Sequence, residues 1–414
     1  MWSEQEMIGK KSIDLRGKKI CWISFLILDM ALHKTSQIEI LRSLAKRGHE
    51  TSLFAVYSKE RPQSNMKDVH LITIPLRYIP CLSSLMYTIF LFVYLPFQFM
   101  HSKPDFVIVE PHDPTFLSLL PTVLLPKSKR PKIIMDIRTT PLVTGYIKTL
   151  LFKTAIRITK KLFDGMTIIT PMMRNEICDE FHIDPKTVGV WTSGASTAIF
   201  NPENYDRVAL RKKHGLHNKF VIFYHGAIGQ SFAQGRARGI FASIKSIEIL
   251  KDKCPDLVLF LLGDSRSYHW IKELIEECGI QDKVILHDKV NYEDVPQYIA
   301  LCDCALVPLP DLSLWRNQCP LKLLEYLTMK KTVIVTDIPA NREIVGDKKC
   351  GIYVSSCDPI EIAKAIEFAY NNKEKLKDWG KLGRTIVIQK YSWDKVAENL
   401  EEYLLRVSTG LGKG

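Results

Sequence analysis

The stretch Cys319–Val335, CPLKLLEYLTMKKTVIV, predicts a short helix followed by a buried strand. Proline is favoured at the first helical position because the N–H that it lacks would have no partner there, so we expect the helix to begin at about Pro320. The free N–H groups of Leu321 and the residues after it, together with the positive end of the helix dipole, would form an anion site. This stretch therefore predicts a place where a phosphate group binds.

Lys322 and Glu325 are three residues apart, so they share one face of this helix. A lysine and a helix N-terminus at one end, with a carboxylate one turn deeper, suit a diphosphate whose attached ribose donates its hydroxyls to the carboxylate. Spacing alone leaves a second interpretation open, which is an ordinary Lys/Glu pair on the surface of a helix.

The chain has 414 residues, which predicts about two or three domains because a single core stops growing beyond about 250 to 300 residues. Its net charge of +12 favours an anionic partner, and nucleic acid, a membrane surface and a phosphorylated substrate all qualify. The ten cysteines are scattered, and the close pair Cys302 and Cys304 lacks the spacing of a zinc site. We therefore expect reduced core thiols and a cytosolic compartment.

Two apolar segments bear on a possible membrane interaction. We expect no secretory signal, because residues 1–18 are polar and the apolar run 20–28 is short and lacks a cleavage site. Residues 78–102 contain no Asp, Glu, Lys or Arg and are long enough to span a bilayer, but Pro96 interrupts them and α/β units flank them. A buried or membrane-dipping helix fits this segment better than a true span.

The first half of the chain alternates strands and helices, which predicts a parallel sheet whose ligands bind beyond the carboxyl ends of the strands. The polar residues expected at those ends are Lys34, His112, Asp136 and Arg138. His112 can donate to a substrate hydroxyl, and Asp136 can orient a sugar or an acceptor. The alternatives are a loop histidine bonded to backbone and an Asp136–Arg138 ion pair.

Residues 142–162 predict an amphipathic helix in which apolar residues separate the cations. The cations are Lys148, Lys153, Arg157, Lys160 and Lys161. This pattern fits an interfacial helix on anionic lipid better than a helix that reads DNA. The alternative is a solvated basic face.

The strand and helix pattern starts again at residue 220, and the strand there leads into a loop, 226–239, with four glycines and two arginines. Glycines let the backbone approach a phosphate closely, and arginines neutralise its charge. Two α/β domains of similar size predict a ligand cleft between them. We expect a flexible arm at 1–18, a first α/β domain at 19–205, a second α/β domain at 206–390, and a C-terminal helix and tail at 391–414 that packs back toward the first domain.

Several segments, taken together, resemble the glycosyltransferases of family 4, which have the GT-B fold of two facing Rossmann-like domains. They are VIFYHGAIG with RARG, LFLLGDS, VILHDKVNYEDVPQYIALCDCALVP, PLKLLEYLTMKKTVIVTDIPANREIV and YSWDKVAENLEEYL, and they cover about residues 220–405. The resemblance is looser in the first half, where it rests on ILRSLAKRGHE, PDFVIVEPHDP and MDIRTTP.

The resemblance implies roles for individual residues. Glu325 would hold the ribose of the donor, Arg238 and Lys322 would bind its phosphates, and His112 would contact the transferred sugar. The residues that would line the nucleotide are Gly226, Gly239, Gly263, Asp264 and, beside the base, Val290. Two positions depart from the family: Asn317 stands where the E-x7-E motif has its first glutamate, and Ala227 where the family has a second phosphate-loop arginine. Branches with a Pro-x-Lys block also lack strict E-x7-E, so we interpret Asn317 as the mark of a subtype that still contacts the donor.

By resemblance, the function would be the retaining transfer of a hexose from a UDP- or GDP-sugar, with no metal or other cofactor. The apolar and basic helices suggest a lipid-linked or cell-envelope glycan acceptor, an anionic membrane surface, and a peripheral enzyme on the cytoplasmic face of the cell membrane. Nucleic-acid binding is not expected, because cations interleaved with stacking aromatics on a sheet or in a groove are not seen. The alternatives are a nucleotide-sugar-binding regulator or partner subunit, which Asn317 and Ala227 motivate, and a GT-B nucleotide-sugar epimerase.

Overall fold

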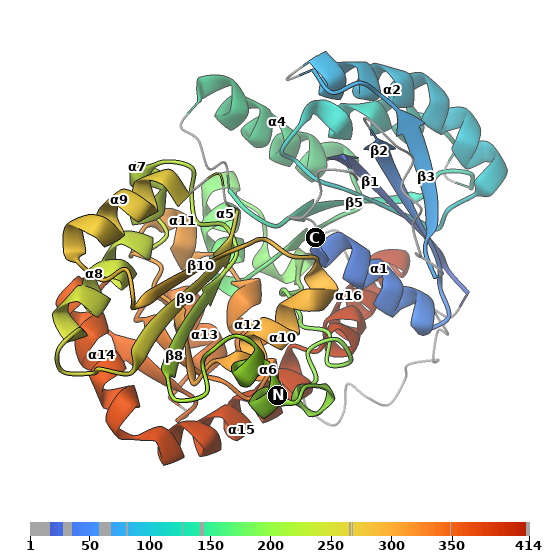
Figure 1. Cartoon of the computed structure of the whole chain (residues 1–414). Helices are drawn as coiled ribbons and strands as arrows, with labels where there is room; N and C mark the ends of the chain where they lie inside the picture. Colours follow the sequence, from blue (N-terminus) through green and yellow to red (C-terminus); the bar gives the residue numbers. More distant parts are fainter. Residues whose placement is uncertain are drawn as a thin grey trace. The chain divides into compact units, whose positions relative to one another are not determined.

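The computed structural model describes residues 17–27, 35–57, 68–79, 82–126, 128–140, 145–264, 266, 268–347 and 349–410. The chain forms two compact units, which we call unit 1 (residues 1–192 with 394–414) and unit 2 (residues 193–393) (Figure 1). Most of the expected N-terminal arm, Lys34 and the expected helix start at 142–144 lie outside the described residues.

Unit 1 contains a seven-stranded sheet in the order β3-β2-β1-β4-β5-β6-β7, whose neighbouring strands are parallel. Its strands are β1 (Lys19–Ile27), β2 (Glu50–Tyr57), β3 (His70–Pro75), β4 (Phe106–Val109), β5 (Lys132–Ile137), β6 (Gly165–Ile168) and β7 (Val188–Val190). The central strands β4 and β5 are mostly apolar and almost entirely buried, as a parallel sheet covered on both faces requires. Strand β3 was not predicted from the sequence; it is an edge strand whose side chains are at most partly buried.

The helices of unit 1 follow the expected order. They are α1 (Thr35–Lys46), α2 (Leu82–Ser102), η3 (Pro114–Leu119), α3 (Leu120–Val123), α4 (Tyr146–Leu162), α5 (Pro171–Phe181), η4 (Pro185–Thr187) and α16 (Trp393–Ser408). Asp113 caps η3, because its carboxylate accepts a hydrogen bond from Thr115 N and Pro114 follows it. This cap opens a 3₁₀ helix, and the short helix α3 continues it.

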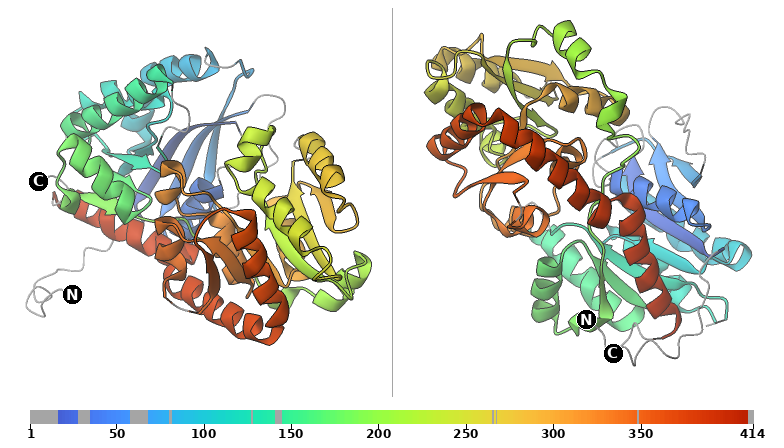
Figure 2. Two further views of the ribbon diagram at one scale, coloured as in Figure 1. Left: turned by 90° about the vertical axis from the view of Figure 1, so that its left-hand side faces the viewer. Right: turned by 90° about the horizontal axis from the view of Figure 1, so that it is seen from below.

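The C-terminal helix α16 belongs to unit 1, where it lies beside α1 (Figures 1 and 2). The hydroxyl of Tyr403 accepts a 2.8 Å hydrogen bond from Met166 N and donates a 3.0 Å bond to Thr187 O. The carboxylate of Glu401 contacts Arg47 Nε at 2.6 Å and His49 Nε2 at 3.0 Å. The end of the chain thus completes the packing of the first unit.

Unit 2 contains a six-stranded sheet in the order β10-β9-β8-β11-β12-β13, whose neighbouring strands are again parallel. Its strands are β8 (Phe220–His225), β9 (Leu257–Gly263), β10 (Val284–Asp288), β11 (Cys304–Val307), β12 (Thr332–Thr336) and β13 (Gly351–Val354). The chain builds this sheet outward from β8 in one direction and from β11 in the other. The switch point between β8 and β11 is where an open α/β sheet binds its ligand, beyond the carboxyl ends of the strands.

The helices of unit 2 are η5 (Pro202–Asn204), α6 (Arg207–Lys213), α7 (Phe232–Arg236), α8 (Ile240–Leu250), α9 (Tyr268–Cys278), η7 (Tyr292–Asp294), α10 (Val295–Leu301), α11 (Ser313–Arg316), α12 (Leu321–Thr328), α13 (Pro339–Val345), α14 (Pro359–Asn371) and α15 (Lys373–Lys390). The short helix α7 lies inside the segment that the sequence predicted as a glycine-rich loop. Unit 2 begins at Ser193, before the expected boundary at residue 205, because Ala195 pairs with the backbone of Tyr391 and Trp393 at the other end of the unit.

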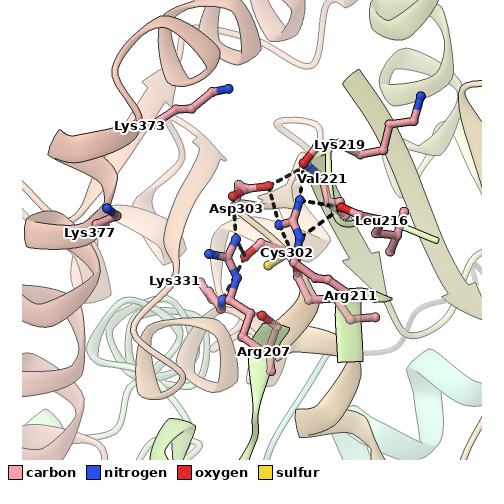
Figure 3. A network of polar contacts seen from close by, with 12 residues as sticks. Arg207, Arg211, Leu216, Lys219, Val221, Cys302, Asp303, Lys331, Lys373 and Lys377 are labelled. Atoms are coloured by element: carbon pink, nitrogen blue, oxygen red, sulfur yellow. Dashed lines mark hydrogen bonds and ion pairs between the residues drawn. The ribbon is translucent and has the colours of Figure 1, made fainter. Parts of the chain in front are cut away.

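A polar network fixes α6 to the amino ends of the unit 2 strands (Figure 3). The carboxylate of Asp303, just before β11, accepts hydrogen bonds from Arg211 Nη1 at 3.0 Å and from Val221 N at 2.8 Å. Lys331, just before β12, donates to the carbonyl oxygens of Ala300 and Cys302. These charged groups lie at the amino ends of their strands and bond to protein groups, so the network holds the fold and leaves the carboxyl ends for a ligand.

Candidate functional site

The candidate site lies at the carboxyl ends of β8 and β11 in unit 2. Helix α12 begins there at Leu321, one residue later than the sequence predicted, and Pro320 is its N-cap residue instead of its first helical residue. The Pro320 carbonyl still accepts a 3.0 Å hydrogen bond from Leu323 N, so the first turn is closed although proline lies outside it. The N–H groups of this turn and the positive dipole end form the expected anion-binding geometry.

Lys322 lies against the end of β8. Its Nζ is 3.8 Å from the centre of the Tyr224 ring, a cation–π contact, and a Cβ at Gly226 would come within 3.3 Å of it. Burial, followed by the nearby Arg238 charge, lowers the pKa of Lys322 to about 7 from its ordinary 10.5, while Glu325 acts in the opposite direction. An anion bound here would supply the negative charge that favours protonated Lys322.

Glu325 is buried, with 4% of its surface exposed, so it does not belong to an ordinary surface pair. Its Oε2 lies 3.0 Å from Nε2 of His225, the last residue of β8. In the part of the chain that the structure describes, the Glu325 carboxylate accepts no hydrogen bond. A buried carboxylate with unused acceptor positions suits hydroxyl donors from a ligand.

Arg238 and Gly239 also lie at the switch point. Gly239 has φ +77° and caps the start of α8, and any Cβ there would collide with the carbonyl oxygen of Pro308, just after β11. The Arg238 guanidinium lies 5.6 Å from the centre of the Trp315 ring, and Trp315 Nε1 donates a 2.8 Å hydrogen bond to Ala237 O. Glycine thus permits the close approach that brings the arginine to this edge of the sheet.

The nucleotide-lining residues expected from the sequence lie on neighbouring loops. A Cβ at Gly263, the last residue of β9, would come within 2.9 Å of Gly226 O, so these two segments run close together. Asp264 follows and bonds to Arg266 Nε at 2.9 Å, with Lys289 at 3.5 Å, and the hydrogen bond from Arg266 lowers its pKa. Because its carboxylate is already held by cations, backbone groups are the better ligand candidates in this loop.

Val290 and Asn317 complete the predicted donor set. Val290 is half-buried and follows Lys289, one of the cations beside Asp264. Asn317 is 4% exposed and ends helix α11, in the segment that leads to Pro320. A neutral amide therefore occupies the buried position where the resembling family has a glutamate.

The unit 1 residues are arranged differently. His112 is half-buried after β4, and its ring stacks on Phe152 of α4 at 6.1 Å.

Asp136 is fully buried and accepts hydrogen bonds from Thr167 Oγ1 at 2.6 Å and Trp191 Nε1 at 2.8 Å. Burial raises its pKa to about 6, against the opposing charge of Arg138, whose Nε is 3.9 Å away. The structure therefore contains the Asp136–Arg138 ion pair that the sequence analysis gave as the alternative to a ligand-binding role.

His225 belongs to the candidate site but was not predicted from the sequence. The signal was available, because His225 ends a buried strand just as His112 follows one. Among the residues that the structure describes, no group of three or more His, Cys, Asp or Glu side chains could hold a metal ion.

Helix α2 has an apolar face that the unit does not cover. Among the described residues it is the one helix long and apolar enough to cross a membrane, and a third of its most apolar stretch is buried. Its exposed large apolar side chains are Leu82, Leu85, Met86, Ile89, Phe90, Phe92, Val93, Phe97 and Met100. Helix α4 also exposes Tyr146, Ile147 and Leu150 near its start.

Comparison with solved structures identifies the architecture. A glycosyltransferase from Rickettsia africae aligns with a TM-score of 0.72 at 17% identity, covering 94% of this chain and 99% of that one. Anabaena Alr3699/HepE, solved with UDP and glucose, aligns with a TM-score of 0.68 at 14% identity and the same coverage. The chain has the GT-B fold. The expected fold class is confirmed.

The sequence comparisons agree with this GT-B architecture. Residues 206–386 match the family described as glycosyl transferases group 1, and this region contains the candidate site. The putative glycosyltransferase EpsD of Bacillus subtilis is 25% identical over 198 residues, which are 47% of this chain and 49% of that protein. The chain thus spans about half the length of the curated relatives that it matches first.

Proposed function

We propose that the protein is a retaining glycosyltransferase of family 4 that transfers a hexose from a UDP- or GDP-sugar to an acceptor hydroxyl. One observation carries the proposal: Lys322, Glu325 and Arg238 gather at the switch point of unit 2, within the region that matches the glycosyltransferase family. The solved complex of Alr3699/HepE with UDP and glucose supports a nucleotide-sugar as the donor.

The proposed reaction depends on stabilising the leaving group. As the bond between the anomeric carbon and the phosphate oxygen breaks, the departing diphosphate gains negative charge. Arg238, Lys322 and the first turn of α12 offer positive charge and N–H donors to it, so we propose that no metal is required. The acceptor oxygen bonds to the anomeric carbon on the face that the diphosphate leaves, and its proton passes to the departing phosphate oxygen, which retains the configuration.

We propose a lipid-linked or cell-envelope glycan as the acceptor, because unit 1 offers a surface that suits a membrane. Water covers a large contiguous apolar face poorly, and the exposed face of α2 is such a face. The opposite face of α2 is buried in unit 1, with Tyr87, Leu91 and Leu95 fully enclosed, so lipid cannot surround the helix. We therefore propose that α2 lies in the plane of the membrane interface rather than spanning the bilayer.

The basic helix α4 supports an anionic surface. Right-handed crossovers put α2 and α4 on the same face of the unit 1 sheet, since both connect strands in the same direction. Two of the expected cations bond within the protein: Lys153 pairs with Glu180 at 2.7 Å, and Lys160 donates to the Phe181 and His182 carbonyls. The cations left for lipid are Lys148, Arg157 and Lys161, which have no ion-pair partner among the described residues.

We propose that the protein is cytoplasmic and peripheral on the inner face of the cell membrane. None of the nine cysteines within the described residues forms a disulfide, and eight of them are buried. Free thiols are typical of a reducing compartment, and anionic lipid at the cytoplasmic leaflet attracts basic segments.

The activity is tested with a panel of UDP- and GDP-sugars and membrane extract, with mass spectrometry of the products. We expect sugar transfer from one donor, slow release of nucleoside diphosphate without acceptor, and a strong decrease of both at low donor concentration in Glu325→Ala. The matched control is Glu248→Ala on α8, which pairs with Lys245 three residues earlier at 3.0 Å and should retain activity. The buried neutral Asn317 motivates a second candidate, a nucleotide-sugar-binding regulator, and binding of a donor without any turnover would favour it.

The membrane proposal is tested by flotation with vesicles of neutral or anionic lipid. We expect the protein to float with anionic vesicles, a variant with Lys148, Arg157 and Lys161 neutralised to float less, and Val93→Asp with Phe97→Asp to remain at the bottom. The control neutralises Lys373, Lys375 and Lys377 of unit 2 and should float like the unmodified protein. Equal flotation of all variants would refute the membrane role and leave the donor chemistry untouched.

A further inference from the structure

His225 is held rigidly at the end of β8. Its side chain is almost entirely buried, and its ring packs edge-on against the Tyr326 ring at 5.1 Å and tilted against Phe223 at 5.9 Å. Its backbone N–H donates a 2.9 Å hydrogen bond to the Tyr326 hydroxyl. Backbone and ring are therefore both fixed by α12 and by the strand, and the ring has little freedom to turn.

This fixed ring faces Glu325. His225 Nε2 lies 3.0 Å from Glu325 Oε2, at ion-pair distance, yet Nε2 has no hydrogen-bond partner within the described residues. The Glu325 carboxylate likewise accepts no hydrogen bond from the described residues and is 4% exposed. Two buried polar groups thus touch each other and keep unused hydrogen-bonding capacity.

Such a pair costs free energy unless a ligand forms hydrogen bonds with it. Buried polar groups without hydrogen bonds lose their contacts with water and gain none that compensate. A carboxylate has about four acceptor positions, and contact with one imidazole occupies only part of them. Neighbouring hydroxyl groups are the ligand that fits, since each can donate to a carboxylate oxygen. A ribose presents two of them.

We propose that His225 is a positioning residue, which holds Oε2 of Glu325 so that the carboxylate faces the 2′- and 3′-hydroxyls of the donor ribose. The proposal rests on the proposed function, which assigns the donor ribose to Glu325, and adds the residue that orients it. If the proposal holds, the protein binds ribonucleotides more tightly than 2′-deoxyribonucleotides, and this preference depends on the His225–Glu325 pair.

The test is a comparison of two ligands and several variants by calorimetry. The ligands are the nucleoside diphosphate that the protein binds, UDP or GDP, and its 2′-deoxy counterpart. His225→Phe keeps a ring against Tyr326 and Phe223 but removes Nε2, and His225→Gln restores a donor. His269→Phe is the matched control, because His269 faces Glu273 at 3.4 Å in an exposed pair on α9 of the same unit.

We expect the unmodified protein and His269→Phe to bind the ribonucleotide at least about tenfold more tightly than the deoxynucleotide. In His225→Phe the preference should fall below about threefold, and His225→Gln should recover part of it. A residue that only supports the fold would weaken both ligands equally, and a His225→Phe variant that keeps the full preference would overturn the proposal. If His225→Phe does not fold, a folded His225→Gln that binds both ligands more weakly by the same factor also overturns it. A protein that binds neither nucleotide refutes the proposed function itself, which is a different result.

Discussion

Asp136 in unit 1 and Glu325 in unit 2 are two buried carboxylates with opposite surroundings. Asp136 accepts hydrogen bonds from Thr167 and Trp191 and has Arg138 3.9 Å away. Glu325 faces His225 and, among the described residues, accepts no hydrogen bond. Both positions looked alike in sequence, as acidic residues near the expected ligand-binding edges of parallel sheets.

The difference teaches that burial alone does not identify a functional carboxylate. Both hydrogen bonds of Asp136 go to its Oδ1 and fix the Trp191 ring, over which the Arg138 guanidinium lies at 3.7 Å, so this oxygen is engaged inside unit 1. Glu325 keeps its capacity at the switch point of unit 2, where a ligand is expected. Asp136 should therefore matter for folding and Glu325 for binding.

The largest expected effect follows from removing each carboxylate. Asp136→Ala leaves Trp191 Nε1 and Thr167 Oγ1 buried without their acceptor and Arg138 without its charge partner, so the free energy of unfolding should fall by about 3–5 kcal/mol. Glu325→Ala should change it by less than about 1 kcal/mol, because no hydrogen bond is lost. Urea unfolding of both variants measures the free energy of unfolding. Equal decreases in the two variants would contradict the different roles of Asp136 and Glu325.

Next in size is a pH effect on stability that arises from Asp136. Its pKa in the folded protein is raised to about 6 by burial, above the ordinary value of about 3.9 in the unfolded chain. The folded state therefore binds the proton more tightly, so this stabilisation is present below about pH 4 and is lost as the pH rises through 6. The loss is up to about 3 kcal/mol. Melting curves of Asp136→Asn should lack this decline, and a parallel decline in both proteins would contradict the assignment.

Glu325→Ala should lower kcat/KM for the donor by about 100-fold, because two hydroxyl bonds to a charged acceptor are lost. Most of the change should appear in KM, since the ribose binds alike in the ground state and the transition state. Initial rates over a range of donor concentrations measure it. Glu248→Ala is the control and should keep the KM of the unmodified protein. An unchanged KM in Glu325→Ala would show that the ribose does not bind at Glu325.

The smallest effect concerns Lys322 and donor affinity. Its pKa is lowered to about 7 by burial and by Arg238, and a diphosphate binds the protonated form best. Affinity for a nucleoside diphosphate should therefore fall about tenfold between pH 7 and pH 8.5, as the lysine loses its proton. Lys322→Met should bind more weakly at pH 7 and show a flatter profile. An identical pH dependence in both proteins would remove Lys322 from the site.

Much of the fold could be predicted from the sequence, because buried parallel strands are apolar runs and helix starts carry local signals. Thr170 and Pro171 open α5, and Asp113 opens η3, with the residue types that are typical of a helix start. Strand β3 was missed because an edge strand is half-buried and lacks such a run. The short helix α7 was hidden by the glycines around it.

The candidate site was predicted in part, for a physical reason. Lys322 and Glu325 share one turn of helix, so local spacing reveals them, and Arg238 follows from its place before Gly239. The partners of Asp136 are 31 and 55 residues away along the chain, and His225 is 100 residues from Glu325, so no local pattern could reveal either arrangement. Whether a carboxylate is satisfied by hydrogen bonds is decided by tertiary packing.

The most direct test of the account is a crystal structure of the protein soaked with the nucleoside diphosphate of its donor. We predict phosphate density at the first turn of α12, within reach of Lys322 and Arg238, with both ribose hydroxyls within hydrogen-bonding distance of Glu325. A nucleotide bound anywhere else, or one whose ribose leaves Glu325 without a hydrogen bond, would contradict it.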